Sequence, residues 1–127
     1  MEKSQKELLI MDMHKKFSDA KIAVLTEFRG IDLGSMTQLR RDLRSENVEY
    51  KVVKNTLARI AVKDTPYEVL ADEFTGPVGV AFGFGDPTVP PKILVDYAKK
   101  IEKLVLRAAS LNGTKLGVNQ IKALAAL

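Results

Sequence analysis

The 127-residue sequence contains no cysteine and no tryptophan, and His14 is its single histidine. Without cysteine the chain can form no disulfide, no thiolate metal site and no cysteine nucleophile. One imidazole leaves no pair at metal-ligand spacing, so we expect His14 to lie on the surface without a partner. No Gly-Lys-Ser/Thr phosphate loop occurs, and the acids show no pairing that suits acid–base catalysis. We therefore expect no metal, no cofactor and no catalytic residue.

Long apolar runs are also missing. No stretch approaches the ~20 apolar residues of a membrane span. The N-terminus, MEKSQKELLIMD, carries too many charges for a secretory signal. Neither a transmembrane segment nor a signal peptide is indicated.

The positive charge of the chain is confined to one region. The net charge is +4, and residues 29–63 hold eight cations against four acids, whereas the segments on either side are balanced. A localised excess suggests an anionic partner at one surface. The alternative is a solvated basic face that has no partner.

Helix and strand signals alternate along the whole chain, which is typical of one α/β domain. We predict a mixed central sheet of about four strands with packed helices, spanning residues 1–127. Capping boxes at Ser4–Glu7 and Ser35–Gln38 mark two helix starts, and Asn55-Thr56 marks another. Helices are predicted at 4–18, 35–46, 55–63, 67–73, 88–103 and from 119 onward. Strands are predicted at 21–28, 48–53, 78–84 and 104–111.

The segment KVVKNTLARIAVK, residues 51–63, is the strongest candidate for a binding site. It has four cations and no acid, and a strand-like run leads directly into a helix start. Cations around exposed helix amides are suited to holding phosphate. Asn55 either caps the helix or bonds to RNA. The candidates are Lys51, Lys54, Asn55, Thr56 and Arg59, with Lys63 as a second-tier contact.

Two further groups of residues extend this candidate site. Arg29-Gly30 follows the first strand, where glycine permits close approach and arginine can fork onto phosphate. On the helix predicted at 35–46, Met36, Leu39 and Leu43 are expected to bury. Three arginines, which lie together on an adjoining side, are second-tier contacts: Arg40, Arg41 and Arg44. The alternative for this helix is ion pairing on a solvated surface.

Aromatic residues are scarce near these cations. Phe28 and Tyr50 are the only two nearby, and both are candidates for the core. This scarcity argues against a platform that stacks single-stranded bases. It favours recognition of the backbone and shape of a folded RNA.

The string FRGIDLGSMTQLRRDLRSENVEYKVVKNTLARIAV resembles the N-terminal domain of the large-subunit ribosomal stalk-base protein family, the bacterial large-subunit ribosomal protein ten family. The resemblance rests on Phe28-Arg29-Gly30, the arginine-rich segment Leu39–Arg44 and the block Lys51–Leu57. Gly76-Pro77 and Asp86-Pro87 match further landmarks, so nearly all of the chain is covered.

The resemblance implies a structural, non-enzymatic protein of the cytoplasmic ribosome. It implies that the domain binds folded large-subunit ribosomal RNA at the stalk base, beside a neighbouring ribosomal protein. In the family, a following C-terminal helix carries dimers of the acidic stalk protein, which recruit translation GTPases. That helix is absent from this sequence. Binding to its own messenger leader is also implied as a possibility.

Three alternatives stay open at this point. One is a ribosome-assembly or messenger-binding relative that uses the same domain on another RNA. Another is a small nucleotide-binding enzyme that uses the loop at 83–87. The third is a module whose cations bind an acidic protein. The uncapped end, Ala-Ala-Leu, suggests a chain that continues further, although a frayed natural end would look the same.

Overall fold

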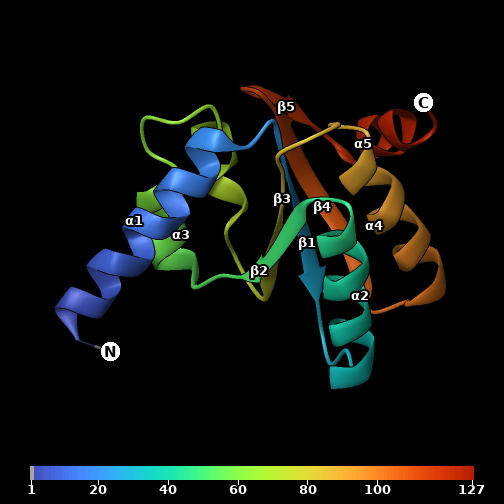
Figure 1. Ribbon diagram of the computed structural model, residues 1–127, viewed down its shortest axis with the longest axis horizontal. Helices are drawn as coiled ribbons and strands as arrows, with labels where there is room; N and C mark the ends of the chain where they lie inside the picture. Colours follow the sequence, from blue (N-terminus) through green and yellow to red (C-terminus); the bar gives the residue numbers. More distant parts are fainter. Residues whose placement is uncertain (1) are drawn as a thin grey trace.

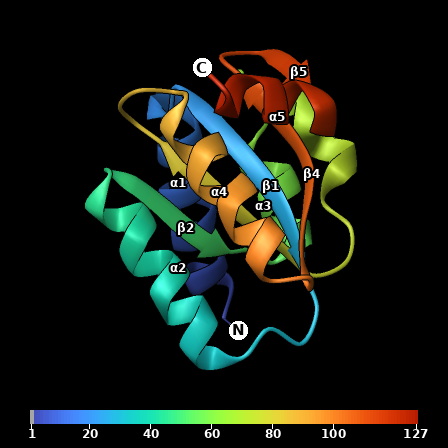
Figure 2. The same cartoon turned by 90° about the vertical axis from the view of Figure 1, so that its right-hand side faces the viewer.

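A five-stranded sheet divides the molecule into two layers of helices, in a computed structural model that describes residues 2–127 (Figure 1). The strands lie in the order β2-β3-β1-β4-β5, and each neighbouring pair is antiparallel. Figure 2 shows α2, α4 and α5 on the face opposite to α1 and α3. The elements are α1 (Lys3–Asp19), β1 (Ile22–Phe28), α2 (Leu33–Ser45), β2 (Val48–Val52), α3 (Asn55–Ala61), a 3-10 helix η1 (Glu68–Glu73), β3 (Val78–Gly83), α4 (Val89–Lys100), β4 (Leu104–Leu111), β5 (Thr114–Leu116) and α5 (Val118–Ala125).

The α/β prediction is confirmed, but the sheet differs from the expected one in two respects. It has five strands rather than about four, because Asn112 and Gly113 adopt left-handed conformations and fold a short β5 back onto β4. All neighbours are antiparallel, whereas a mixed sheet was predicted. The reason is that β1 and β2 run in the same direction but are separated by β3, which is antiparallel to both.

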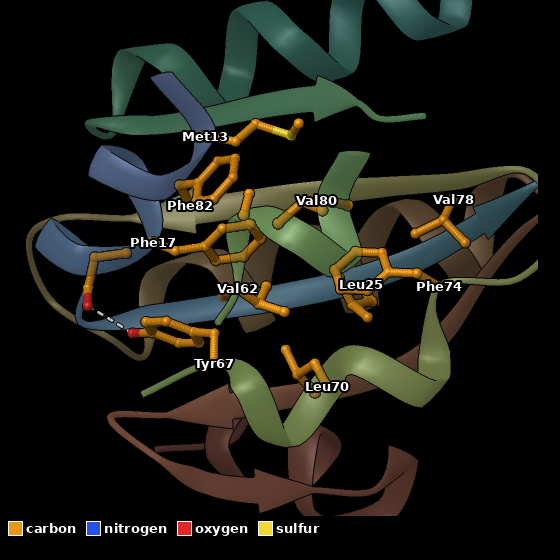
Figure 3. Close-up of a cluster of buried hydrophobic side chains, with 14 of the residues drawn as sticks. Met13, Phe17, Leu25, Val62, Tyr67, Leu70, Phe74, Val78, Val80 and Phe82 are labelled. Carbon is orange, nitrogen blue, oxygen red and sulfur yellow. Dashed lines mark hydrogen bonds between the residues drawn. The ribbon is translucent and has the colours of Figure 1, made fainter. Parts of the chain in front are cut away.

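One core lies between the sheet and the layer formed by α1, α3 and η1 (Figure 3). Phe17 is fully buried there, and its ring centroid lies 4.8 Å from that of Phe82 and 5.7 Å from that of Tyr67. The Tyr67 hydroxyl donates to the Ala20 carbonyl at 2.5 Å, which satisfies a phenol in an otherwise apolar layer. Phe74 closes this core just before β3 begins.

A second core lies under α2, α4 and α5. Leu39 and Leu43 are buried as predicted, and Met36 packs partly buried beside them. Tyr50 reaches across this face and shares a 2.6 Å hydrogen bond with the buried Thr26 hydroxyl. Phe28 is partly buried in the same core. Both aromatics near the basic segment therefore belong mainly to the core.

Two helix starts and the surroundings of His14 differ from expectation. Asp32 caps α2 by accepting from the Ser35 amide at 3.1 Å, so this helix begins before the predicted Ser35. At the start of α1, the Gln5 side chain accepts from the Glu2 amide, ahead of the predicted box. His14 is not an unpartnered surface residue, because its Nδ1 lies 2.9 Å from the Ala61 carbonyl oxygen.

Candidate nucleic-acid interface

The strand order gathers several cations at one end of the sheet. The carboxyl ends of β1 and β2 lie beside the amino ends of β3 and β4, because the strand pairs are antiparallel (Figure 1). Arg29 directly follows β1, Lys54 lies two residues after the end of β2, and Lys103 directly precedes β4. The loop at 74–77 leads into β3 and therefore lies between Lys54 and Arg29. We call this row, formed by Lys54, the loop 74–77, Arg29, Gly30 and Lys103, the sheet-end rim.

Arg29 is held in place but remains accessible. Its Nε and Nη2 both donate to Glu27 Oε1 at 2.7 Å, while the side chain stays 76% exposed. The other guanidinium N–H groups can therefore still bind a ligand. Gly30 has a φ of 62°, and its carbonyl oxygen lies 3.4 Å from Lys103 Nζ. Sequence reasoning missed Lys103, which lies 73 positions along the chain from Gly30.

The start of α3 corrects the predicted role of Asn55. Lys54, not Asn55, occupies the N-cap position, and Asn55 is the first helical residue. Its Nδ2 donates to the Gly76 carbonyl at 2.8 Å, and its Oδ1 is buried without a hydrogen-bond partner within residues 2–127. Lys54 and Thr56 are exposed beside it. Since α3 has only seven residues, its dipole contributes less than a long helix would.

The two remaining cations of this segment have different surroundings. Arg59 lies one turn after Asn55, and its Nη2 donates to the Phe74 carbonyl oxygen. Lys63 follows the end of α3 and is exposed. Lys63 has no ion pair in the part of the chain that the structure describes. Arg59 therefore has an internal bond that Lys63 lacks.

Arg107, from β4, is a second residue that sequence reasoning missed. Its Nη1 donates to the Thr75 carbonyl oxygen and its Nη2 to Thr75 Oγ1 at 3.0 Å. Nη2 also lies 3.8 Å from a carboxylate oxygen of Glu73. The only sequence signal for this role is one cation in a mainly apolar strand. Charge counting by segment could not reveal it, because residues 64–127 are balanced overall.

Lys51 connects the basic segment to α1 and faces a hollow that it shares with α2. Its Nζ lies 3.1 Å from Asp12 Oδ2, and Lys16 donates to the same oxygen at 2.6 Å. The bond from Lys16, and to a lesser degree that from Lys51, holds the pKa of Asp12 below its usual value. Lys51 also lines an open hollow along β2 together with Arg40 and Arg44.

The three arginines of α2 form a free surface. Arg40, Arg41 and Arg44 are all exposed and line a second shallow hollow on this helix. None of them has an acidic partner in the structure of residues 2–127. The nearby Asp42 instead accepts from the Tyr97 hydroxyl and from Gln38. Pairing on a solvated surface, the alternative considered for this helix, therefore does not occur here. We call these residues the α2 arginine face.

The loop at 83–87 is organised as a turn. The Asp86 carboxylate accepts from the backbone amide and the hydroxyl of Thr88, at 2.9 Å and 2.8 Å, so a phosphate would meet an acid there. A Cβ on Gly83 would lie 2.7 Å from side-chain atoms of both Ile22 and Pro90, so this glycine serves packing. These contacts argue against the nucleotide-binding alternative.

Residues 2–127 hold no cluster of three or more potential metal-ligating His, Cys, Asp or Glu residues. No helix described by the structure has the length and apolar character needed to cross a membrane.

The chain is similar to structural proteins of the large ribosomal subunit. It is 49% identical over 128 residues to "Large ribosomal subunit protein uL10" of Myxococcus xanthus, covering 100% of this chain and 74% of that protein. It is 46% identical over 127 residues to the protein of the same name from Syntrophus aciditrophicus, covering 100% and 73%. The corresponding protein of Desulfovibrio desulfuricans is 47% identical, with the same coverage.

These similarities place the chain among the structural, non-enzymatic proteins of the large ribosomal subunit. A family model described as "Ribosomal protein L10" matches residues 1–99. The chain belongs to the ribosomal protein L10 family, whose members are cytoplasmic components of the ribosome.

Proposed function

We propose that this domain binds a folded region of large-subunit ribosomal RNA through the sheet-end rim and the α2 arginine face. The observation that carries the proposal is the gathering of Lys54, Arg29 and Lys103 at one end of the sheet, although they are far apart in the sequence. An anionic backbone that crosses this end would meet all three. The free arginines of α2 extend the positive surface.

The residues of the interface contribute in different ways. Lys54, Lys63 and the α2 arginine face have no carboxylate partner among the described residues, so they supply affinity that depends on salt. Arg29 and Lys51 must share their charge with Glu27 and Asp12. Thr56 and Gly30 add placement through a hydroxyl and an open backbone. Asn55 and Arg59 take part chiefly through the loop that they bind.

Shape and backbone recognition fit this surface better than base stacking. Tyr50 is buried and Phe28 is partly buried, so neither offers an open ring to a base. Arginine and lysine reach phosphates and ribose hydroxyls without requiring unstacked bases. A folded RNA element is therefore the preferred ligand.

Family membership supports the location of this RNA at the base of the ribosomal stalk. We propose that a neighbouring ribosomal protein lies beside the domain there. We propose that acidic stalk dimers, which recruit translation GTPases, are carried by the C-terminal helix that the family resemblance implies. We propose that the same surface also binds the leader of its own messenger RNA.

Replacement of Lys54 by alanine tests the proposed interface. Filter binding to a stalk-base RNA fragment is measured across a potassium chloride series. Loss of one phosphate contact lowers the magnitude of the slope of log K against log salt by about 0.7–0.9. Lys21→Ala is the matched control, because this exposed lysine precedes β1 at the opposite end of the sheet. An unchanged slope in the Lys54 variant would remove this residue from the interface.

A competition experiment distinguishes binding to stalk-base ribosomal RNA from the alternative of a messenger-binding or ribosome-assembly protein that binds another RNA. Unlabelled stalk-base RNA should displace the labelled fragment at lower concentration than other structured RNAs of equal length. Equal competition by all of them would indicate binding to charge alone.

A further inference from the structure

The loop that leads into β3 is held by side chains at three consecutive carbonyl oxygens. Two donors come from α3 and one comes from β4. The pairs are Arg59 to the Phe74 oxygen, Arg107 to the Thr75 oxygen and Asn55 to the Gly76 oxygen. The Phe74 side chain is itself fully buried in the first core (Figure 3), so the loop is anchored at its start as well.

These bonds fix the direction of the Gly76 amide. In a trans peptide the N–H points opposite to the carbonyl. Because Arg107 binds the Thr75 oxygen on the protein side, the N–H of Gly76 points away from the protein. This N–H has no acceptor among the described residues, and Gly76 is exposed. Pro77, which follows, has no N–H to offer.

The space outside Gly76 is open. Gly76 has a φ of 74°, and a Cβ built on it would meet no atom within 4 Å. A ligand can therefore approach the backbone closely at this point. Since the loop lies between Lys54 and Arg29, a strand of phosphates that contacts both cations passes over Gly76.

We propose that the backbone amide of Gly76 donates a hydrogen bond to an RNA phosphate and that Arg107 is the positioning residue for it. This inference rests on the proposed RNA-binding function. Arg107 acts through the loop, because its side chain is only 20% exposed and is already bonded to Thr75 and close to Glu73. The contact is uncharged on the protein side, so it adds affinity and geometry without adding to the salt dependence.

Three variants and one spectrum test this proposal. In Arg107→Leu the loop loses its central donor, and RNA affinity should fall about tenfold or more. The salt slope should stay at the wild-type value, in contrast to Lys54→Ala. Arg107→Lys retains a donor that can reach the Thr75 oxygen and should restore part of the affinity. A slope that falls by about one in Arg107→Leu would make this arginine a phosphate ligand and overturn its positioning role.

Gly76→Asn keeps the test independent of Arg107. Asparagine tolerates the left-handed backbone, and its side chain would project into the open space where the RNA approaches. We expect the strain to lower the thermal midpoint by a few degrees at most, which leaves the protein folded in the assay, and we expect a loss of RNA affinity of about tenfold or more. Wild-type affinity in this variant would show that nothing approaches Gly76.

The amide signal of Gly76 in the wild-type protein gives a direct readout. On titration with the stalk-base RNA fragment, its proton resonance should shift and its exchange with solvent should slow. Suppose that Lys54→Ala changes the salt slope, that the Gly76 signal stays unchanged on titration with RNA, and that Arg107→Leu and Gly76→Asn bind RNA as tightly as the wild-type protein. This inference then fails and the proposed function stands. If wild-type protein shows no binding to the fragment, the proposed function itself fails.

Discussion

Replacement of Gly79 by alanine should be among the most destabilising small substitutions in this protein. A Cβ on Gly79 would lie 2.1 Å from Tyr50 Oη and 2.4 Å from Tyr50 Cζ. The phenol has little room to retreat, because Tyr50 is 6% exposed and its hydroxyl is bonded to the buried Thr26. The ring must therefore move and break that hydrogen bond.

The expected magnitude follows from three contributions. Overpacking of a well-packed core costs about 1–3 kcal/mol. Leaving the Thr26 hydroxyl buried without a partner adds about 1–3 kcal/mol. The lower entropy of the unfolded chain returns about 0.4–1 kcal/mol. Together they lower the free energy of unfolding by about 1–5 kcal/mol, or the thermal midpoint by about 4–20 °C at this chain length.

Urea unfolding of a double-mutant cycle checks the cause. In a Tyr50→Val background the ring is gone, so adding Gly79→Ala should cost little or nothing. Gly34→Ala is the matched control, because the nearest atom to its Cβ is 3.9 Å away and the glycine lies in α2. That control should gain up to about 1 kcal/mol from helix propensity. An equal cost of Gly79→Ala in both backgrounds would refute the argument.

Two predictions concern pH. The depressed pKa of Asp12 means that its ionised form contributes stability above about pH 4 and that this contribution is lost as the pH falls. Asp12→Asn should therefore be less stable than wild type in urea at pH 7 and equal to it near pH 2. Burial raises the pKa of Tyr50, and it raises the pKa values of Tyr67 and Tyr97 to about 12, the latter with help from Asp42. Tyrosine contributions to stability are thus complete below about pH 10, and those of Tyr67 and Tyr97 are lost toward pH 12. Absorbance at 295 nm of the folded protein should therefore show two of the three tyrosines ionising well above pH 10. Ionisation of all three near pH 10 in the folded protein would contradict the burial.

The alternation of sequence patterns was sufficient to predict most elements of the fold. β4 was predicted with its observed bounds, and apolar spacing identified the buried positions Leu39 and Leu43. Pairing direction could not be predicted, because it depends on which strand lies between β1 and β2, and local periodicity carries no such information. The short β5 was missed since a three-residue strand has too few positions to show alternation.

The candidate site was predictable where its residues are close in sequence. Lys54 and Thr56 are exposed as expected, and the α2 arginines lie together on one face. Lys103 and Arg107 were missed because they are far along the chain from the start of β3. They come near it only in the folded protein, where β1 lies between β3 and β4 and η1 leads into the loop that Arg107 binds. The capping role of Asn55 was wrong because the side chain found a carbonyl acceptor 21 residues away instead of the local amide.

The internal bonds also change how the charge of residues 29–63 should be counted. Arg29 and Lys51 are each bound to a carboxylate, so a phosphate that binds them must displace or share an acid. Arg59 keeps its charge but directs it to the Phe74 carbonyl. If the domain binds RNA as proposed, the number of counterions released would therefore be smaller than the number of cations in the segment. The salt dependence of that binding would measure mainly Lys54, Lys63 and the α2 arginine face, whereas the contribution of the loop would be seen only in the affinity at fixed salt.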